Sequence, residues 1–358
     1  MASHQPSIAA ADIGGGIAPA PLSVLDQVTT GTGTTPAEAL AAATELARHA
    51  ETWGYHRFWV AEHHGMPGLG SPAPAVLIAH LAAHTRRLRL GSGGVMLPNH
   101  TPLAVAEQFG LLQALHPGRI DLGIGRAPGG DQATARALRR STADFPTEVH
   151  DLIRFLDGDF PLDHPHHKIA AIPHTDPRPP VWLLGSTSSS AALAGRLGLP
   201  YAYNHRVGRE PPELALDSYR THFRPSRQQD QPYAILAVSA VAAPDEHQAR
   251  RLARTAGMAM IRLRRPVPEP APLMTPEQAQ SYPISPPEAE LLDRWLTELV
   301  LGDPGRVAER LESLRQRAGA HELMITTHIH GQHARTWSYQ HVAHAYGLVR
   351  RLAPMPTD

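Results

Sequence analysis

The chain has 358 residues, of which 42% are hydrophobic and 18% are charged, and its 33 Lys and Arg balance its 33 Asp and Glu. These values suit a globular protein with a sizeable core, and the balanced charge gives no electrostatic case for binding nucleic acid or an acidic membrane. The lack of cysteine excludes disulfides, thiolate metal sites and cysteine nucleophiles, and no segment has the pattern of a signal peptide or of a membrane span of ~20 residues, so we expect a cytoplasmic protein.

The first half of the chain alternates short apolar strands with capped helices. Residues 1–20 are expected to be a flexible leader, followed by a single domain over residues 21–358. Thr35 and Glu38 form a capping box, and Gly54 is suited to end the helix that this box begins. The predicted strands are Pro21–Asp26, Arg57–Ala61, Leu88–Leu90 and Ile120–Ile124. The predicted helices run from Thr35 to Trp53, from Ser71-Pro72 to Thr85, and from Thr101-Pro102 onward.

The second half continues the alternation but contains two long irregular segments. These are the loop Gly158–Pro180, whose His164, His166 and His167 are expected to be solvated, and the proline-rich excursion Leu263–Pro287. The predicted strands are Val181–Leu184, Leu199–Tyr203, Tyr233–Val241 and Glu322–Thr326. The predicted helices are Thr147–Leu156, Ser186–Leu197, Pro212–Phe223, Asp245–Arg262, Glu288–Leu299, one capped by Asp303-Pro304, and Ser338–Leu352. Eight alternating units predict a (β/α)8 TIM barrel, with an extended loop and helix insertion between the seventh and eighth strands.

A barrel would bring the carboxyl ends of its strands to one mouth, where such folds bind ligands. Gly185-Ser186 and the serines up to Ser190 begin a helix, where free N–H groups and the helix dipole favour an anion. Arg126, at the end of a neighbouring strand, can supply a charged partner. Ordinary helix capping is the alternative role for the serines.

Two other strand ends have open interpretations. Gly93-Gly94 is either a loop that needs positive φ or a backbone that approaches a flat ligand ring closely. Glu62-His63-His64 is either a base with its orienting carboxylate or, with His328 and His330, a set of metal ligands. Because no further ligand at a defined spacing accompanies these histidines, we predict no metal site.

Four segments carry a resemblance to a known family. They are WVAEHH (Trp59–His64), GSGGVMLPNHTPLAVAEQFGLL (Gly91–Leu112), HPGRIDLGIGRAPG (His116–Gly129) and WLLGSTSSSAALAGRLGLPYA (Trp182–Ala202). In this order they resemble the bacterial luciferase-like flavin monooxygenases, and in particular the single-chain luciferase-like oxygenases, some of which tailor polyketides. The resemblance implies a TIM barrel that binds FMN at the carboxyl ends of its strands.

The resemblance also implies where the cofactor binds. Arg126 and the helix start at Gly185-Ser186 would hold the FMN phosphate, and whether Ser189 or Ser190 makes a further contact stays open. Ala61 and Glu62 would lie beside the flavin. Gly93-Gly94 would correspond to the family's non-prolyl cis peptide under the ring.

The same resemblance implies a catalytic residue, and the barrel would bring further polar residues to the same mouth. His63 matches the histidine implicated in luciferase catalysis, and Glu62 is its predicted catalytic neighbour. The predicted substrate pocket contains Asp26, His64, Asn204 and His205.

The implied reaction is FMNH2-dependent monooxygenation, in which reduced FMN and O2 form a C4a-peroxide that oxygenates an organic substrate. The Pro/Ala/Arg-rich composition, typical of a GC-rich genome, suggests an aromatic polyketide in natural-product biosynthesis. Gly158–Pro180 and Leu263–Pro287 are the candidates for a lid that excludes water. No second nucleotide site is evident, so a separate flavin reductase is the expected partner. The family's luciferases pair two different chains, and a homodimer stays open here.

Two alternatives remain at this point. An F420-dependent oxidoreductase fits the same phosphate site, because both cofactors carry a phosphate on a ribityl chain. A flavin-binding protein without catalytic turnover is the other alternative.

Overall fold

The computed structural model describes residues 17–205, 208 and 210–348, so most of the predicted leader over residues 1–20 lies outside the described residues. The described chain divides into two compact units. Unit 1 contains Trp59–Gly65 and Ser71–Ala234, and unit 2 contains residues 17–58, Met66–Gly70 and residues 235–348. The single domain predicted over residues 21–358 stays a prediction.

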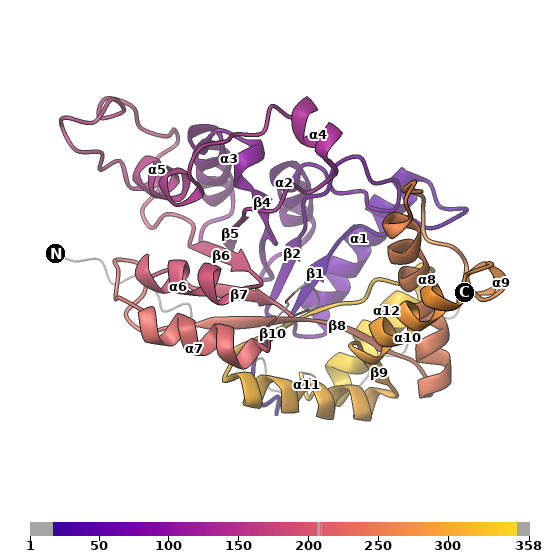
Figure 1. The fold of residues 1–358 in the computed structure, drawn as a ribbon. Coiled ribbons are helices and arrows are strands. Elements are labelled where there is room, and N and C mark those ends of the chain that lie inside the picture. The colour runs from indigo at the N-terminus through magenta and orange to yellow at the C-terminus, as the bar shows by residue number, and fades with distance from the viewer. Residues whose placement is uncertain (1–16, 206–207, 209, 349–358) are drawn as a thin grey trace. The chain divides into compact units, whose positions relative to one another are not determined.

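Unit 1 is a run of parallel strands with helical connections (Figure 1). Its strands pair in the order β3-β5-β6-β7, and β4 pairs with β5. Its strands are β3 (Arg89–Ser92), β4 (Val95–Met96), β5 (Ile120–Gly125), β6 (Val181–Gly185) and β7 (Tyr201–Asn204). Its helices are α2 (Pro74–His84), the 3-10 turn η1 (Leu97–Asn99), α3 (Pro102–Leu115), α4 (Gln132–Ala137), α5 (Phe145–Asp157), α6 (Ser188–Arg196) and α7 (Pro212–His222).

Unit 2 contains the remaining elements, and its strands β1, β10 and β8 pair in parallel. Its strands are β1 (Leu22–Asp26), β8 (Ala234–Ala242), β9 (Val300–Gly302) and β10 (Glu322–Thr326), and β2 (Arg57–Val60) crosses from unit 2 into unit 1. Its helices are α1 (Pro36–Thr52), α8 (Glu246–Arg264), α9 (Pro276–Ser281), α10 (Pro286–Thr297), α11 (Pro304–Ala318) and α12 (Gln332–Ala345).

The strand order along the sheet is β10-β1-β2-β3-β5-β6-β7-β8-β9, and β10 also pairs with β8. Eight of these strands are the ones that the sequence predicts, and their order returns to its start, as in a (β/α)8 barrel. The predicted fold class is therefore confirmed. The insertion between the seventh and eighth predicted strands is also present, since α8, α9, α10, β9 and α11 separate β8 from β10.

Several predicted boundaries are wrong for identifiable reasons. Helix α2 begins at Pro74 rather than at Ser71-Pro72, because the Ser71 carbonyl accepts the His63 N–H and Ala73 is the N-cap. Strand β3 continues to Ser92, past the predicted end at Leu90, because the Ser92 hydroxyl bonds to both backbone groups of Gly123.

The remaining differences concern short elements and the last helix. The sequence reading missed β4, β9, α4 and α9, each of six residues or fewer. Helix α12 begins at Gln332, six residues before the predicted Ser338, and ends at Ala345, just before the positive φ of Gly347. Part of the range predicted for it, residues 349–352, lies outside the described residues.

The loop that follows α5 is less polar than its sequence suggests. His164 stacks on Phe160 with ring centroids 4.5 Å apart, and the His166 ring contacts both Phe155 and Phe160. The sequence predicts that these imidazoles are solvated. The structure instead places His164 and His166 in an aromatic cluster. Residues 158–180 contain no helix or strand, and they extend away from α5 in Figure 1.

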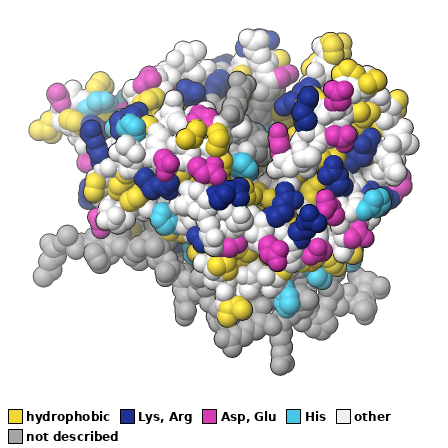
Figure 2. Space-filling model, turned by 60° about the horizontal axis from the view of Figure 1, so that its bottom comes forward, with side chains coloured by type: hydrophobic (Ala, Val, Ile, Leu, Met, Phe, Trp, Pro, Cys, Tyr) yellow, Lys and Arg dark blue, Asp and Glu magenta, His cyan; other side chains and the backbone are white. Residues whose placement is uncertain are grey.

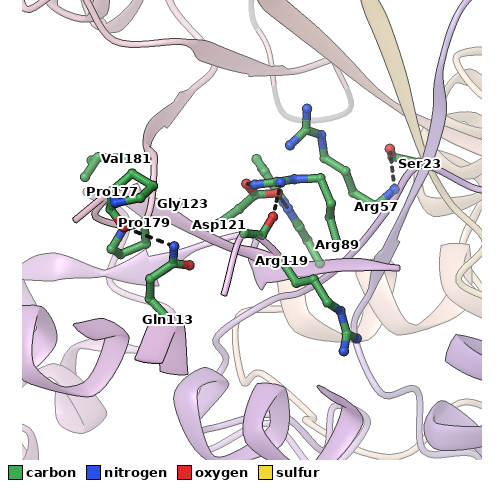
Figure 3. A network of polar contacts seen from close by, with 12 residues as sticks. Ser23, Arg57, Arg89, Gln113, Arg119, Asp121, Gly123, Pro177, Pro179 and Val181 are labelled. Carbon is green, nitrogen blue, oxygen red and sulfur yellow. Dashed lines mark hydrogen bonds and ion pairs between the residues drawn. The ribbon is translucent and has the colours of Figure 1, made fainter. Parts of the chain in front are cut away.

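A buried polar chain supports the strands of unit 1. The Trp59 indole N–H donates to Asp121 across 3.1 Å. Arg89 forms an ion pair with the same carboxylate (Figure 3). Asp121 is fully buried, so both partners compensate its charge where water cannot. On the face in Figure 2, Lys and Arg side chains are interspersed with Asp and Glu, in keeping with the balanced composition.

Unit 2 holds two buried ion pairs between residues far apart in sequence. Arg57 pairs with Glu322 at 3.0 Å, and both side chains are 0% exposed. Asp26, a predicted substrate-pocket residue, instead pairs with Arg335 at 3.0 Å and accepts the Val28 N–H. Its Oδ1 atom is therefore occupied by structural contacts within unit 2.

Candidate functional site

Nearly all the predicted site residues lie in unit 1, and Glu62 is at the centre of their hydrogen bonds. The Glu62 carboxylate is fully buried directly after β2. It accepts bonds from His64 Nε2 at 2.8 Å, His100 Nε2 at 3.0 Å and the Met96 N–H at 3.0 Å. Burial alone would raise the pKa of this carboxyl, but the bonds from His100, His64 and Met96 outweigh burial and lower the pKa. Glu62 is thus held as a carboxylate.

The network continues from Glu62 into the segment after β5. Asn99 donates to Glu62 at 3.1 Å and to the Pro128 carbonyl at 3.0 Å. Arg140 donates to the Asn99 side chain at 3.0 Å and to the carbonyls of Arg126 and Ala127. The loops after β2, β4 and β5 are therefore joined by one set of polar contacts, which fixes the backbone that carries Arg126.

The structure distinguishes the two adjacent histidines after β2. His64 is oriented by Glu62 through its ring and by the Gly129 carbonyl through its backbone N–H. His63 is half-buried, and its backbone N–H donates to Ser71. Hence the imidazoles that pair with the Glu62 carboxylate are those of His64 and His100.

Gly93 and Gly94 follow β3 and are both buried. The peptide bond between them is cis, as the resemblance implied, and neither glycine has positive φ, so that alternative is wrong. A Cβ on Gly94 would lie 2.9 Å from the Gly123 carbonyl oxygen and 3.1 Å from Leu184. The backbone of the segment after β3 therefore lies directly on β5 and β6.

Arg126 and Gly185 lie at the same level on neighbouring strands. Strands β5 and β6 pair in parallel with Ile124 opposite Leu183, so two further residues along each strand bring Arg126 beside Gly185. The Arg126 side chain is exposed, and its guanidinium makes no ion pair among the described residues. Within the part of the chain that the structure describes, a cation without an ion-pair partner thus lies beside the turn that begins α6.

The first turn of α6 divides its serines into two classes. Thr187 is the N-cap, and Ser190 completes a capping box with it and also bonds to the Tyr201 hydroxyl at 2.8 Å. A Cβ on Gly185 would lie 2.1 Å from the Ser190 hydroxyl oxygen, which explains the glycine. Ser190 therefore has a structural role, whereas Ser189 is exposed beside it.

An acidic side chain from outside the helix occupies the start of α6. The Glu210 carboxylate accepts the Ser188 N–H at 3.0 Å and also the Ser188 hydroxyl. The bonds from the Ser188 hydroxyl and N–H lower the pKa of Glu210. The α6 N-terminus thus binds an anionic side chain of the chain itself. The predicted site for a ligand anion stays a prediction.

The other predicted pocket residues are only partly placed near this set. Asn204 ends β7 and its carbonyl accepts the Gly208 N–H, while His205 follows it in a turn. Ala61 is buried immediately before Glu62. Among the described residues, no group of three or more His, Asp or Glu side chains is arranged to hold a metal ion, and no helix is long and apolar enough to cross a membrane.

Sequence reasoning missed four residues of the site. Asn99 and His100 lie within a segment that the resemblance covers, but only their contact with Glu62 reveals what they do. Arg140 and Glu210 follow loops of no regular pattern, and nothing in the sequence indicates which helix or carbonyl each would contact.

Comparison with known proteins decides the family. The model of the luciferase-like monooxygenase family matches residues 21–322. The chain belongs to this family. A luciferase-like monooxygenase of Escherichia coli is 42% identical over 322 residues, 89% of this chain and 94% of the relative. N-acetyl-S-alkylcysteine monooxygenase of Bacillus subtilis is 35% identical over 336 residues, 92% of this chain and 99% of that enzyme.

A solved structure supports the same family assignment. The crystal structure of apo-MsnO8 has a TM-score of 0.83 and 38% identity, and the match covers 94% of this chain and 99% of that chain. The resemblance inferred from the sequence is therefore confirmed, and monooxygenase is the class of enzyme that family membership supports.

Proposed function

We propose that this luciferase-like protein is an FMNH2-dependent monooxygenase that oxygenates a small organic molecule. The observation that carries the proposal is the start of α6, where backbone and hydroxyl donors of Ser188 already bind a carboxylate, beside the exposed guanidinium of Arg126. A phosphate monoester needs such a combination of a helix N-terminus and a charged fork.

The residues present fit the phosphate of FMN. Arg126 would bind it from the end of β5, and Gly185 and Ser186 would approach it from the end of β6. Of the two serines left open by the sequence, Ser189 is the proposed ligand, because the Ser190 hydroxyl is bonded to Thr187 and Tyr201. F420 carries a phosphate in a similar position, so the phosphate site alone does not distinguish FMN from F420. The proposal of FMN rests on this site together with the family.

The remaining predicted residues would surround the ring and the reacting atoms. Gly93-Gly94 is the proposed support for the flavin ring, with Ala61 and Glu62 at its edge. His63 is the proposed proton donor and acceptor, since an imidazole titrates near neutral pH. Glu62 acts through His64, His100 and Met96, and we therefore propose it as a positioning residue rather than one that exchanges protons with substrate.

Bound reduced FMN would supply the electrons that activate O2, and the protein would exclude water from that chemistry. Residues 158–180 and 263–287 stay the proposed lids. Within unit 2, the second of these is fastened by an Arg265–Glu288 ion pair at 2.9 Å. The Leu273 N–H also donates to the Thr30 carbonyl, and the Leu273 carbonyl accepts the Thr32 N–H. A separate reductase, a homodimer and a cytoplasmic location stay predictions.

The test has two steps. Anaerobic titration with FMNH2 and with reduced F420 decides the cofactor, and we expect the tighter binding for FMNH2. The loaded protein is then mixed with 18O2 and candidate substrates, and one 18O atom is expected in the product. Aromatic polyketides test the substrate predicted from the sequence, and S-alkylcysteine derivatives test the chemistry named for the Bacillus subtilis relative. Binding of F420 alone, or of neither cofactor, would sink the proposal.

A further inference from the structure

We propose that the Glu210 carboxylate is an internal competitor for the phosphate site at the start of α6. The inference rests on the proposed function. It states that a cofactor phosphate must displace Glu210 before it can bind there, and it makes Glu210 a residue that determines selectivity for dianionic ligands.

The Glu210 carboxylate lies on the donors of Ser188. One Glu210 oxygen accepts the Ser188 N–H at 3.0 Å, and the other accepts the Ser188 hydroxyl. Ser188 is the first residue of α6, and its N–H is one of the donors that the helix itself leaves without a partner. A ligand phosphate at the helix start would need these same donors.

Helix α6 takes the negative charge at its N-terminus from outside the helix. Its first turn contains no acidic residue, whereas α1, for example, carries Glu38 in its first turn. A negative charge near a helix N-terminus is stabilising, and Glu210 supplies that charge from the segment before α7. A bound phosphate would also place negative charge at this helix N-terminus. The free N–H groups therefore have an anionic partner whether Glu210 or phosphate is bound there.

Only the Glu210 side chain has to move for a phosphate to take its place. The backbone carbonyl of Glu210 accepts the Tyr203 hydroxyl at 2.7 Å, which anchors the main chain to the end of β7. A Cβ on Gly208 would lie 2.2 Å from the same Tyr203 oxygen, so the backbone packs tightly there. The carboxylate is half-exposed and can rotate toward solvent without breaking that anchor.

Charge decides which ligands can cause the exchange. A phosphate monoester carries a charge of about −1.5 to −2 at neutral pH and offers three acceptor oxygens, whereas Glu210 carries one negative charge and two. Two anions cannot share the Ser188 donors at hydrogen-bonding distance without strong repulsion. Riboflavin, which lacks the phosphate, does not require the exchange, and its binding is therefore expected to be independent of Glu210.

The experiment compares the wild-type chain with the variants Glu210→Gln and Glu290→Gln. Glu290 is an exposed residue of α10, so its substitution removes the same charge at a distant position as a control. Dissociation constants are measured by flavin fluorescence for FMN and for riboflavin, and inorganic phosphate is added to each protein in a thermal-shift assay. Because the apparent Kd is the intrinsic Kd divided by the fraction of sites that are open, we expect Glu210→Gln to tighten FMN binding about tenfold. Riboflavin binding stays unchanged, and phosphate raises the Tm more than in the wild type.

A second variant, Glu210→Ala, removes the acceptor as well as the charge and is expected to tighten FMN binding in the same direction. The inference is overturned if FMN binds equally or more weakly to both variants, or if FMN and riboflavin tighten together. If neither FMN nor FMNH2 binds to any of the proteins, both the inference and the proposed function fail. The inference alone fails in a different case: FMN binds to the wild type, Arg126→Ala weakens FMN binding, and Glu210→Gln leaves FMN binding unchanged.

Discussion

Glu62→Gln is the substitution that tests how the site is positioned. Every group that contacts the Glu62 carboxylate is a donor: two imidazole Nε2 atoms, one backbone N–H and one amide N–H. Glutamine keeps one acceptor oxygen but presents an NH2 group where the second oxygen was. Its amide would therefore face donors from whichever side it is placed.

The expected loss of stability follows from counting those donors. If the glutamine oxygen takes the Oε1 position, its NH2 faces Met96 and His100; if it takes the Oε2 position, its NH2 faces His64 and Asn99. Each buried donor left unsatisfied costs about 1–3 kcal/mol, and the buried carboxylate is lost as well. A neutral imidazole can change tautomer, but the Met96 N–H cannot. We expect a loss of about 2–4 kcal/mol.

The assay is urea unfolding of Glu62→Gln and of the exposed control Glu290→Gln between pH 7 and pH 3. Because the pKa of Glu62 is held below its ordinary value of 4.5, its carboxylate stabilises the fold above pH 4.5. That contribution is lost as the pH falls through the lowered pKa. The wild type and the Glu290→Gln control should lose the same amount of unfolding free energy as the pH falls. Glu62→Gln should lose less, because it has no carboxylate at position 62 to protonate.

Two results would refute the reasoning. One is a stability change in Glu62→Gln within about 0.5 kcal/mol of the control, the range of ordinary surface substitutions. The other is a loss of unfolding free energy with falling pH in Glu62→Gln identical to that of the wild type. Either result would mean that the buried network does not hold the loops after β2, β4 and β5.

Three further predictions concern single residues. Arg126→Ala should weaken FMN binding about 10- to 100-fold by fluorescence titration and leave riboflavin unchanged, because a charge-assisted bond is worth about 1.5–3 kcal/mol; equal weakening of both ligands would exclude the phosphate contact. Ser189→Ala should weaken FMN binding without lowering the Tm. Ser190→Ala should instead lower the free energy of unfolding by about 1 kcal/mol, because the capping box is lost. The opposite result for the two variants would exchange their roles. Gly123→Ala should destabilise the fold by about 1–3 kcal/mol in urea unfolding, since its Cβ would lie 2.1 Å from a backbone oxygen of β3, and wild-type stability would show that the strands can separate there.

Local signals explain which predictions from the sequence succeeded. The capping box of Thr35 and Glu38 and the positive φ of Gly54 are set by residues within a few positions of one another, and both are present as predicted. Elements of two or three residues, such as β4 and β9, carry no periodicity, so no pattern could reveal them. The start of α12 was misplaced because its first turn is marked by Gly331 rather than by a side-chain cap.

The candidate site shows the same division. The sequence by itself determined the alternation of strands and helices, the glycine-rich strand ends and the family motifs, because each depends on residue type and spacing along the chain. Only the tertiary structure decided that Glu62 joins three loops, that Ser190 is used for capping while Ser189 is exposed, and that Glu210 occupies the start of α6. The physical reason is that hydrogen bonds and charge compensation act between groups that are close in space. Ser188 and Glu210 are 22 residues apart in the chain, and no local sequence pattern indicates that they meet.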